Sequence, residues 1–128
     1  MLVDTSVWID YLNGYPSPQA DRLATAISEG MPIVLCGVVI TEILLGLPEA
    51  EASRIETLLE AFVLAPEPER QDYSAAAHLY RTCRSKGITI RSVIDCLIAQ
   101  TCLKHDYPLL AKDQDFVQIA RYFSLQLL

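Results

Sequence analysis

The chain has 128 residues, of which 52% are hydrophobic and 20% are charged. This length suits one domain with a single core, and this composition excludes a disordered chain. The formal net charge of -6 argues against a protein that coats nucleic acid nonspecifically, unless bound metal ions reverse the field around some of the acids.

The sequence carries no sign of export or of membrane insertion. Its opening, Met1 to Asp4, lacks the basic and apolar regions of a secretory signal, and its longest apolar stretch, Ile33 to Ile40, is too short to span a bilayer. The four cysteines have no CxxC spacing and lie mostly among apolar residues. We expect buried free thiols, with a disulfide or a zinc site as alternatives, in a cytoplasmic protein without membrane contact.

Five short apolar runs predict the strands of a sheet. Because polar residues do not alternate within them, these strands are expected to be buried on both faces of a parallel sheet. The runs are Met1 to Val3, Ile33 to Leu35, Phe62 to Leu64, Leu109 to Ala111 and Leu125 to Leu128.

The segments between these runs have the apolar spacing of amphipathic helices. Ser17-Pro18 and Gly30 mark the two ends of one helix, and a helix that Ser92 can cap ends at Tyr107-Pro108. Further helices are expected at Ser6 to Leu12, near Glu42, at Ile55 to Phe62, at Tyr73 to Gly87 and at Phe116 to Phe123. The alternation predicts one α/β domain, residues 1–128, with a mostly parallel sheet.

Four acids stand where an apolar run gives way to a helix or a loop: Asp4, Glu42, Asp95 and Asp113. Three of them follow predicted strands, and sites in parallel sheets form beyond the carboxyl ends of the strands. Gathered carboxylates raise one another's pKa values, and Mg²⁺ or Mn²⁺ relieves that repulsion because hard cations favour oxygen ligands. Zinc is disfavoured, since the set consists of acids alone and includes no His or Cys. The pattern indicates a metal site for phosphoryl-transfer chemistry.

Single acids among these also have simpler interpretations. Asp4 can cap the helix that follows it, Asp95 stands at capping-box spacing after Ser92, and Asp113 can hold a turn. Glu42 is the hardest to explain in this way, because it interrupts a strongly apolar stretch.

Asp113 and Asp115 lie two residues apart at the start of the last predicted helix. Asp115 is adjacent to that helix and is the better candidate for its cap. Asp113 lies nearer the end of the strand and is the better metal ligand, although both can face the ion.

Four blocks of the chain together resemble PIN-domain ribonucleases of the VapC toxin type. The first block is Met1 to Asp10, and the second is Thr41-Glu42 with Leu45-Gly46 behind it. The similarity is strongest in Ile94 to Ala99 and in Leu109 to Phe116. Any one block is weak, but four in the family's order are specific, and they cover essentially the whole chain.

The resemblance implies a three-layer α/β/α sandwich with a central, mostly parallel sheet. It implies a Mg²⁺- or Mn²⁺-dependent endoribonuclease, the toxin of a toxin–antitoxin system, with a cognate VapB-type antitoxin and a homodimeric state. The implied metal ligands are Asp4, Glu42, Asp95 and Asp113, with Asp115 close by.

Other positions follow the resemblance less closely. Ser6 matches the small polar position that supports the first aspartate, and Thr5 beside it is expected to assist. Lys112 stands where a Thr, Ser or Asn is often found, and Cys96 and Cys102 replace commoner apolar residues. These departures leave the acidic set untouched.

The expected reaction is cleavage of RNA phosphodiester bonds by a metal-activated water. Arg91 and Lys112 lie nearest the acids in sequence among the basic residues, so we expect them to contact RNA phosphate. Two other functions stay open from the residues alone: a structure-selective DNA nuclease, and a noncatalytic interaction module that keeps the fold.

Overall fold

The computed structural model describes residues 1–128 and is built on one four-stranded parallel sheet with the order β3-β2-β1-β4. The strands are β1 (Leu2–Val3), β2 (Val34–Leu35), β3 (Val63–Leu64) and β4 (Leu109–Leu110). Because all pairings are parallel, the carboxyl ends of the four strands lie along one edge of the sheet.

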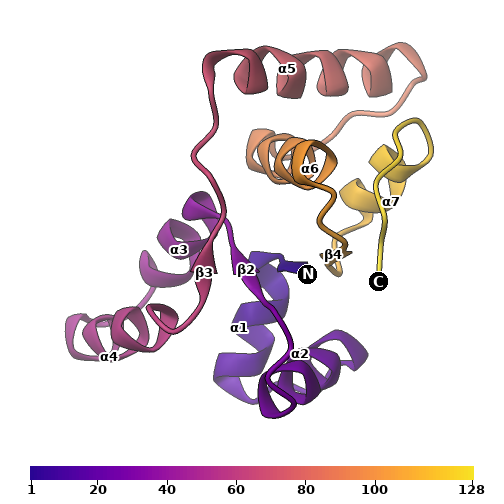
Figure 1. The fold of residues 1–128 in the computed structure, drawn as a ribbon. Coiled ribbons are helices and arrows are strands. Elements are labelled where there is room, and N and C mark those ends of the chain that lie inside the picture. Colours follow the sequence, from indigo (N-terminus) through magenta and orange to yellow (C-terminus); the bar gives the residue numbers. More distant parts are fainter.

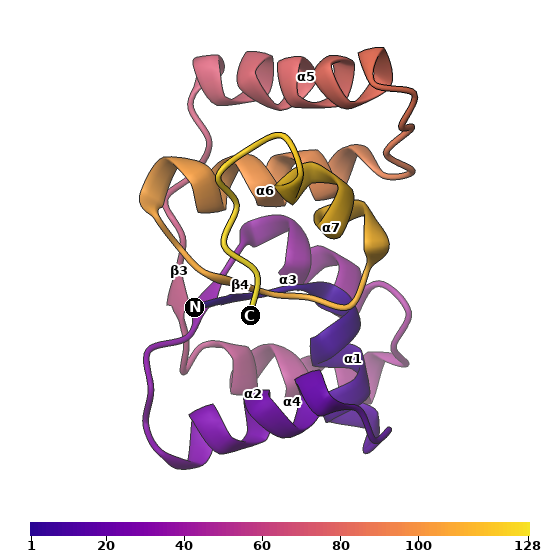
Figure 2. The same cartoon turned by 90° about the vertical axis from the view of Figure 1, so that its right-hand side faces the viewer.

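Seven helices surround the sheet. Figures 1 and 2 show α1, α2 and α4 on one side of the strands and α5, α6 and α7 on the other, while α3 contacts α1 and α4. The helices are α1 (Thr5–Asn13), α2 (Pro18–Ser28), α3 (Gly37–Leu44), α4 (Glu49–Leu59), α5 (Arg70–Ser85), α6 (Val93–His105) and α7 (Gln114–Ala120). This arrangement confirms the predicted α/β/α sandwich. None of the helices combines the length and the apolar character needed to cross a membrane.

The ends of α2 show how local sequence sets the helix boundaries. The Ser17 hydroxyl accepts a hydrogen bond from the backbone N–H of Ala20 at 3.0 Å, and Pro18 occupies the first helical position. Beyond the other end, Gly30 has φ 67°, a left-handed conformation that glycine adopts without steric cost.

Two of the predicted strands differ from the expectation. β3 was expected to be buried on both faces, but Val63 is 68% exposed and Leu64 48% exposed, because β3 is the edge strand of the sheet. The run Leu125 to Leu128 forms no strand of its own and contributes only one bridge, between Leu127 and Leu109.

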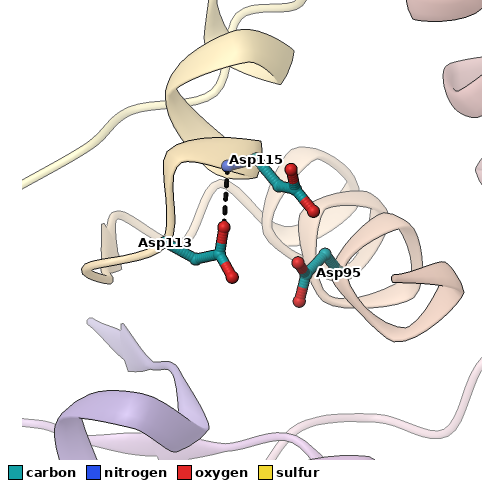
Figure 3. Close-up of side chains that lie close together, drawn as sticks. All are labelled: Asp95, Asp113 and Asp115. Atoms are coloured by element: carbon teal, nitrogen blue, oxygen red, sulfur yellow. Dashed lines mark hydrogen bonds between the residues drawn. The ribbon is translucent and has the colours of Figure 1, made fainter. Parts of the chain in front are cut away.

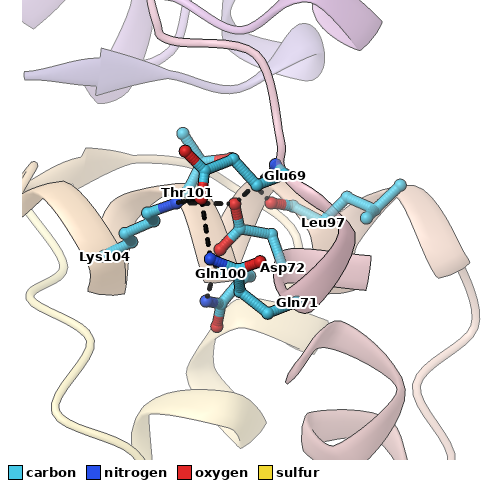
Figure 4. Close-up of polar contacts among 7 residues, drawn as sticks. All are labelled: Glu69, Gln71, Asp72, Leu97, Gln100, Thr101 and Lys104. Atoms are coloured by element: carbon cyan, nitrogen blue, oxygen red, sulfur yellow. Dashed lines mark hydrogen bonds and ion pairs between the residues drawn. The ribbon is translucent and has the colours of Figure 1, made fainter. Parts of the chain in front are cut away.

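A polar cluster joins α5 to α6. We call Glu69, Asp72, Gln100 and Lys104 the α5–α6 clamp (Figure 4). The buried Asp72 carboxylate accepts hydrogen bonds from Lys104 Nζ at 2.8 Å, from the Glu69 backbone N–H at 2.8 Å and from Gln100 Nε2 at 3.3 Å. The Lys104 ammonium, followed by these other donors, lowers the pKa of Asp72 to about 2. The clamp fixes α5 against α6, the helix that carries Asp95.

The four cysteines are free and buried, as predicted. Burial raises the pKa of the Cys96 thiol to about 11 and that of Cys102 to about 12. Thiols with such pKa values stay protonated near neutral pH and behave as small apolar core groups.

Candidate functional site

Three aspartates converge where β4 leads into α7. One carboxylate oxygen from each of Asp95, Asp113 and Asp115 can be chosen so that all three lie within 4.8 Å of one another (Figure 3). Asp95 comes from the first turn of α6, whereas Asp113 and Asp115 come from the start of α7. We call these residues the three-acid group.

Asp95 is the most constrained member of the group. The residue is only 8% exposed, and its Oδ2 atom is buried without a hydrogen-bond partner. Burial raises the pKa of Asp95 to about 8, and the charges of Asp4, Asp113 and Asp115 add to the effect. The capping-box interpretation fails, because Ser92 makes no side-chain cap hydrogen bond at this helix start. A buried carboxylate oxygen without a hydrogen-bond partner is costly when the group is ionised, and protonation or a bound cation would reduce that cost.

The residue expected to cap α7 is wrong: Asp113 caps the helix, and Asp115 does not. Asp113 is the N-cap of α7, and its Oδ1 accepts a hydrogen bond from the backbone N–H of Asp115 at 2.9 Å. The helix begins at Gln114, so Asp115 already lies inside the first turn, where its side chain cannot serve as the cap. Asp115 is buried instead and accepts a hydrogen bond from the Arg91 backbone N–H at 2.9 Å.

Asp4 lies near the three-acid group but is not among the carboxylates whose oxygens come within 4.8 Å of one another. Its backbone N–H donates to Leu110 at the end of β4, which sets Asp4 at the same edge of the sheet. Asp4 occupies the N-cap position of α1, but its side chain makes no cap hydrogen bond; Oδ2 accepts from the Ser6 hydroxyl at 2.8 Å. Burial raises the pKa of Asp4, and the negative charge of Asp4 in turn raises that of Asp95.

Glu42 lies at the margin of the site. It is half-buried on α3, and its Oε1 accepts a hydrogen bond from the Thr5 hydroxyl at 2.7 Å. Its charge contributes to the raised pKa of Asp4. The structure therefore brings together two of the four predicted ligands with Asp115, places Asp4 within their electrostatic reach and connects Glu42 through Thr5.

The two basic residues expected at the site both contact carboxylates. Arg91 Nη2 lies 3.1 Å from Asp113 Oδ1, and Arg91 Nε lies 3.6 Å from Asp115 Oδ1. Lys112 pairs with Asp10 on α1. The sequence analysis missed the roles of Arg91 and Asp10 as partners of these groups, and the only signal for Asp10 was its place in the first family-like block.

The donor set fits a hard divalent cation. Every candidate ligand is a carboxylate oxygen, no nitrogen or sulfur donor belongs to the group, and one buried oxygen has no partner. Oxygen-only sites of this kind suit Mg²⁺ or Mn²⁺, and a cation would offset the burial and the mutual repulsion that raise the pKa of Asp95.

Comparison with known proteins identifies the family to which this fold and site belong. Residues 1–122 match the family model of the PIN domain. The chain belongs to the PIN-domain family. A relative of this PIN domain is the VapC ribonuclease Mb1587 of Mycobacterium bovis, which is 34% identical over 128 residues, covering 98% of this chain and 96% of the relative.

Solved structures share the fold of this PIN domain. The VapBC2 structure from Rickettsia felis, solved with a promoter DNA fragment, aligns with a TM-score of 0.76 at 18% identity and covers 99% of this chain and 96% of its own. The VapBC-1 structure from nontypeable Haemophilus influenzae aligns with a TM-score of 0.75 at 21% identity, and the alignment covers 99% of this chain and 95% of the Haemophilus chain.

Proposed function

We propose that this PIN domain is a divalent-metal-dependent endoribonuclease, the toxin component of a toxin–antitoxin system. The observation that carries the proposal is the three-acid group, in which the buried Oδ2 atom of Asp95 lacks a partner. The relative from Mycobacterium bovis, named a VapC ribonuclease, supports RNA as the substrate.

Asp95 and Asp113 are the proposed principal ligands of Mg²⁺ or Mn²⁺, with Asp4, Asp115 and Glu42 completing the acidic surroundings. A bound divalent ion supplies charge neutralisation at the scissile phosphate and lowers the pKa of a water molecule. The chain's own residues hold the geometry: Ser6 orients Asp4, and Thr5 orients Glu42. Arg91 and Lys112 are the proposed contacts to the RNA backbone.

The test compares Asp95→Asn with the wild type on single-stranded RNA, in Mg²⁺ or Mn²⁺ and in excess chelator. We expect chelator to abolish cleavage and Asp95→Asn to slow it by at least about 100-fold, since a ligand is lost. The matched control is Asp106→Asn, the same change at the exposed end of the same helix, which should cleave at the wild-type rate. Full metal-dependent activity in Asp95→Asn would refute the assignment. Cleavage of DNA instead of RNA, measured in parallel, would change the substrate class.

Two assembly states belong to the same proposal. A VapB-type antitoxin is the proposed partner, because the structural relatives were solved as VapBC assemblies. A homodimer is proposed from the resemblance in the sequence alone. Light scattering of the purified chain tests the dimer, and a monomer at all concentrations examined would exclude it.

A further inference from the structure

Arg91 occupies a position that a divalent ion would contest. Its guanidinium contacts two members of the three-acid group, at 3.1 Å from Asp113 Oδ1 and 3.6 Å from Asp115 Oδ1. An arginine guanidinium is charged at any ordinary pH, and the charges of these two acids raise the pKa of Arg91 further. Part of the negative charge that a metal ion would neutralise is therefore already neutralised by the protein.

The main chain and the side chain of Arg91 are held differently. The backbone N–H donates to the buried Asp115 Oδ2 at 2.9 Å, an interaction that does not depend on the side chain. The guanidinium, in contrast, reaches the acids from a side chain that is 73% exposed. It can leave the acids for solvent without moving the backbone that supports Asp115.

The three-acid group cannot bind the Arg91 guanidinium and a divalent ion at full strength at the same time. Asp113 Oδ1 already accepts two hydrogen bonds, one from the Asp115 backbone and one from Arg91. Asp95 Oδ2, the buried oxygen without a partner, is free for an ion, but an ion there adds two positive charges next to the guanidinium. Repulsion between neighbouring cations in a partly buried site is strong enough to break an exposed ion pair.

The geometry points to Arg91 as an internal counter-cation that the divalent ion displaces, and that then binds the phosphodiester of the substrate. This inference rests on the proposed function, because it needs both the ion and an RNA backbone. Arginine suits the second role, since its planar fork binds phosphate oxygens in pairs. Metal binding and substrate binding are thereby linked through one side chain.

The first test measures Mn²⁺ affinity by titration calorimetry, a readout that needs no catalysis. We expect Arg91→Gln to bind Mn²⁺ at least about fivefold more tightly than the wild type, because the competing charge is gone. Arg91→Lys, which keeps the charge but loses the fork, should lie between the two. Equal or weaker binding by a folded Arg91→Gln would overturn the inference, and weaker binding would show that the side chain merely supports the acids.

Lys112→Gln is the matched control. It removes the same charge next to Asp113 in sequence, from a lysine that pairs with Asp10 outside the three-acid group. We expect its Mn²⁺ affinity to change by less than about twofold, since more distant charges are screened. An increase in Lys112→Gln as large as that in Arg91→Gln would mean that net charge, not displacement of Arg91, sets the affinity.

The second test uses RNA cleavage at saturating Mn²⁺. Loss of the phosphate contact in Arg91→Gln should raise KM by about fivefold or more and leave kcat within about threefold, as expected for lost ground-state binding. An unchanged KM would overturn the second part of the inference, that Arg91 binds the phosphodiester of the substrate. If the wild type itself neither binds Mn²⁺ nor cleaves RNA, the proposed function fails. If it does both and Arg91→Gln gains no affinity, only this inference fails.

Discussion

Asp95 illustrates the energetic cost of burying a carboxylate among other acids. Its carboxylate is buried among like charges, and burial with those charges raises its pKa to about 8. The unfolded chain has no such surroundings, so the pKa of its aspartate is near the ordinary value of 3.8. Between these two pH values the folded protein without metal binds a proton that the unfolded chain has released. Stability therefore falls as the pH rises through this window.

Asp95→Asn should make the metal-free protein more stable. The asparagine does not ionise, so the variant lacks the loss of stability that the wild type undergoes between pH 4 and pH 8. We expect the two proteins to unfold similarly near pH 4.5, and the variant to be more stable by about 1–3 kcal/mol at pH 8. Urea unfolding in chelator, at equal protein concentration, measures the difference. If the difference in the free energy of unfolding between the variant and the wild type does not grow with pH, the assigned pKa shift is wrong. Asp106→Asn serves as the control.

At the level of elements, α6 carries the site and α5 holds α6 in place. The α5–α6 clamp connects the first turn of α5 to the last turns of α6 through a buried aspartate and a lysine. Removing one partner of such a pair leaves an uncompensated charge, which costs more than the pair itself contributes. Loss of one clamp residue is therefore expected to destabilise the packing of α5 against α6.

Lys104→Met tests the clamp. The methionine keeps most of the apolar stem but leaves Asp72 buried without its cation, so we expect the melting temperature at pH 7 to fall by about 5 °C or more. The folded pKa of Asp72 is about 2 against 3.8 unfolded, so its contribution is present above pH 3.8 and disappears as the pH falls through 2. The destabilisation should shrink in that acid range.

Lys86→Met is the control for this comparison. Lys86 is an exposed lysine at the end of α5 and has no carboxylate partner, so its replacement should change the melting temperature by less than about 1–2 °C. Equal losses in the two variants would show that the clamp contributes nothing beyond a surface lysine.

Element boundaries could be predicted where the signal is local. The Ser17 cap and the Gly30 stop are properties of a few neighbouring residues, and both predicted ends of α2 are confirmed. The exposure of Val63 could not be predicted, because strand order decides which strand lies at the edge and apolar runs do not encode that order. The last predicted strand, Leu125 to Leu128, is reduced to a single bridge, which its apolar residues alone did not indicate.

The gathering of acids at one edge of the sheet could be predicted from the sequence, but the geometry of the group could not. Parallel strands place Asp4 and Asp113 at one edge of the sheet, an inference that needs only the strand pattern. The closeness of Asp115 depends on where α7 begins, and because the helix starts at Gln114 the cap is Asp113 and not Asp115. The contacts of Arg91 join residues more than twenty positions apart, which no local pattern reports.

At the scale of the whole molecule, the proposed function requires an acidic protein to bind RNA, which is itself a polyanion. The chain has 10 Lys and Arg against 16 Asp and Glu. Several of the cations already pair with carboxylates, and these are Arg54, Arg91, Lys104 and Lys112. The six basic side chains without such a partner stand against 16 acids, so the proposed function requires that a divalent ion at the acidic edge supplies much of the attraction for a polyanion.

This charge distribution predicts unusual RNA binding. Affinity for a short single-stranded RNA should depend on divalent ions and should decline only gently with monovalent salt. Each phosphate contact on a single strand contributes about -0.7 to the slope of log K against log salt, so two or three contacts give a slope of about -2 or shallower. Fluorescence anisotropy with Ca²⁺ in place of Mg²⁺ measures binding, and a gel at the end of each titration verifies that the RNA is intact.

The salt slope and the chelator dependence together separate two ways of binding RNA. A protein that relies on a basic surface gives a slope of about -4 or steeper and binds equally well in chelator, because counterion release drives its association. If this PIN domain behaves in that way, the acidic edge is not the centre of the RNA site, and the role proposed for its metal ion is wrong. If the slope of log K against log salt is shallow and RNA binding is lost in chelator, the RNA and the ion bind at the same group of carboxylates. The Asp95→Asn variant should then lose RNA affinity together with its metal.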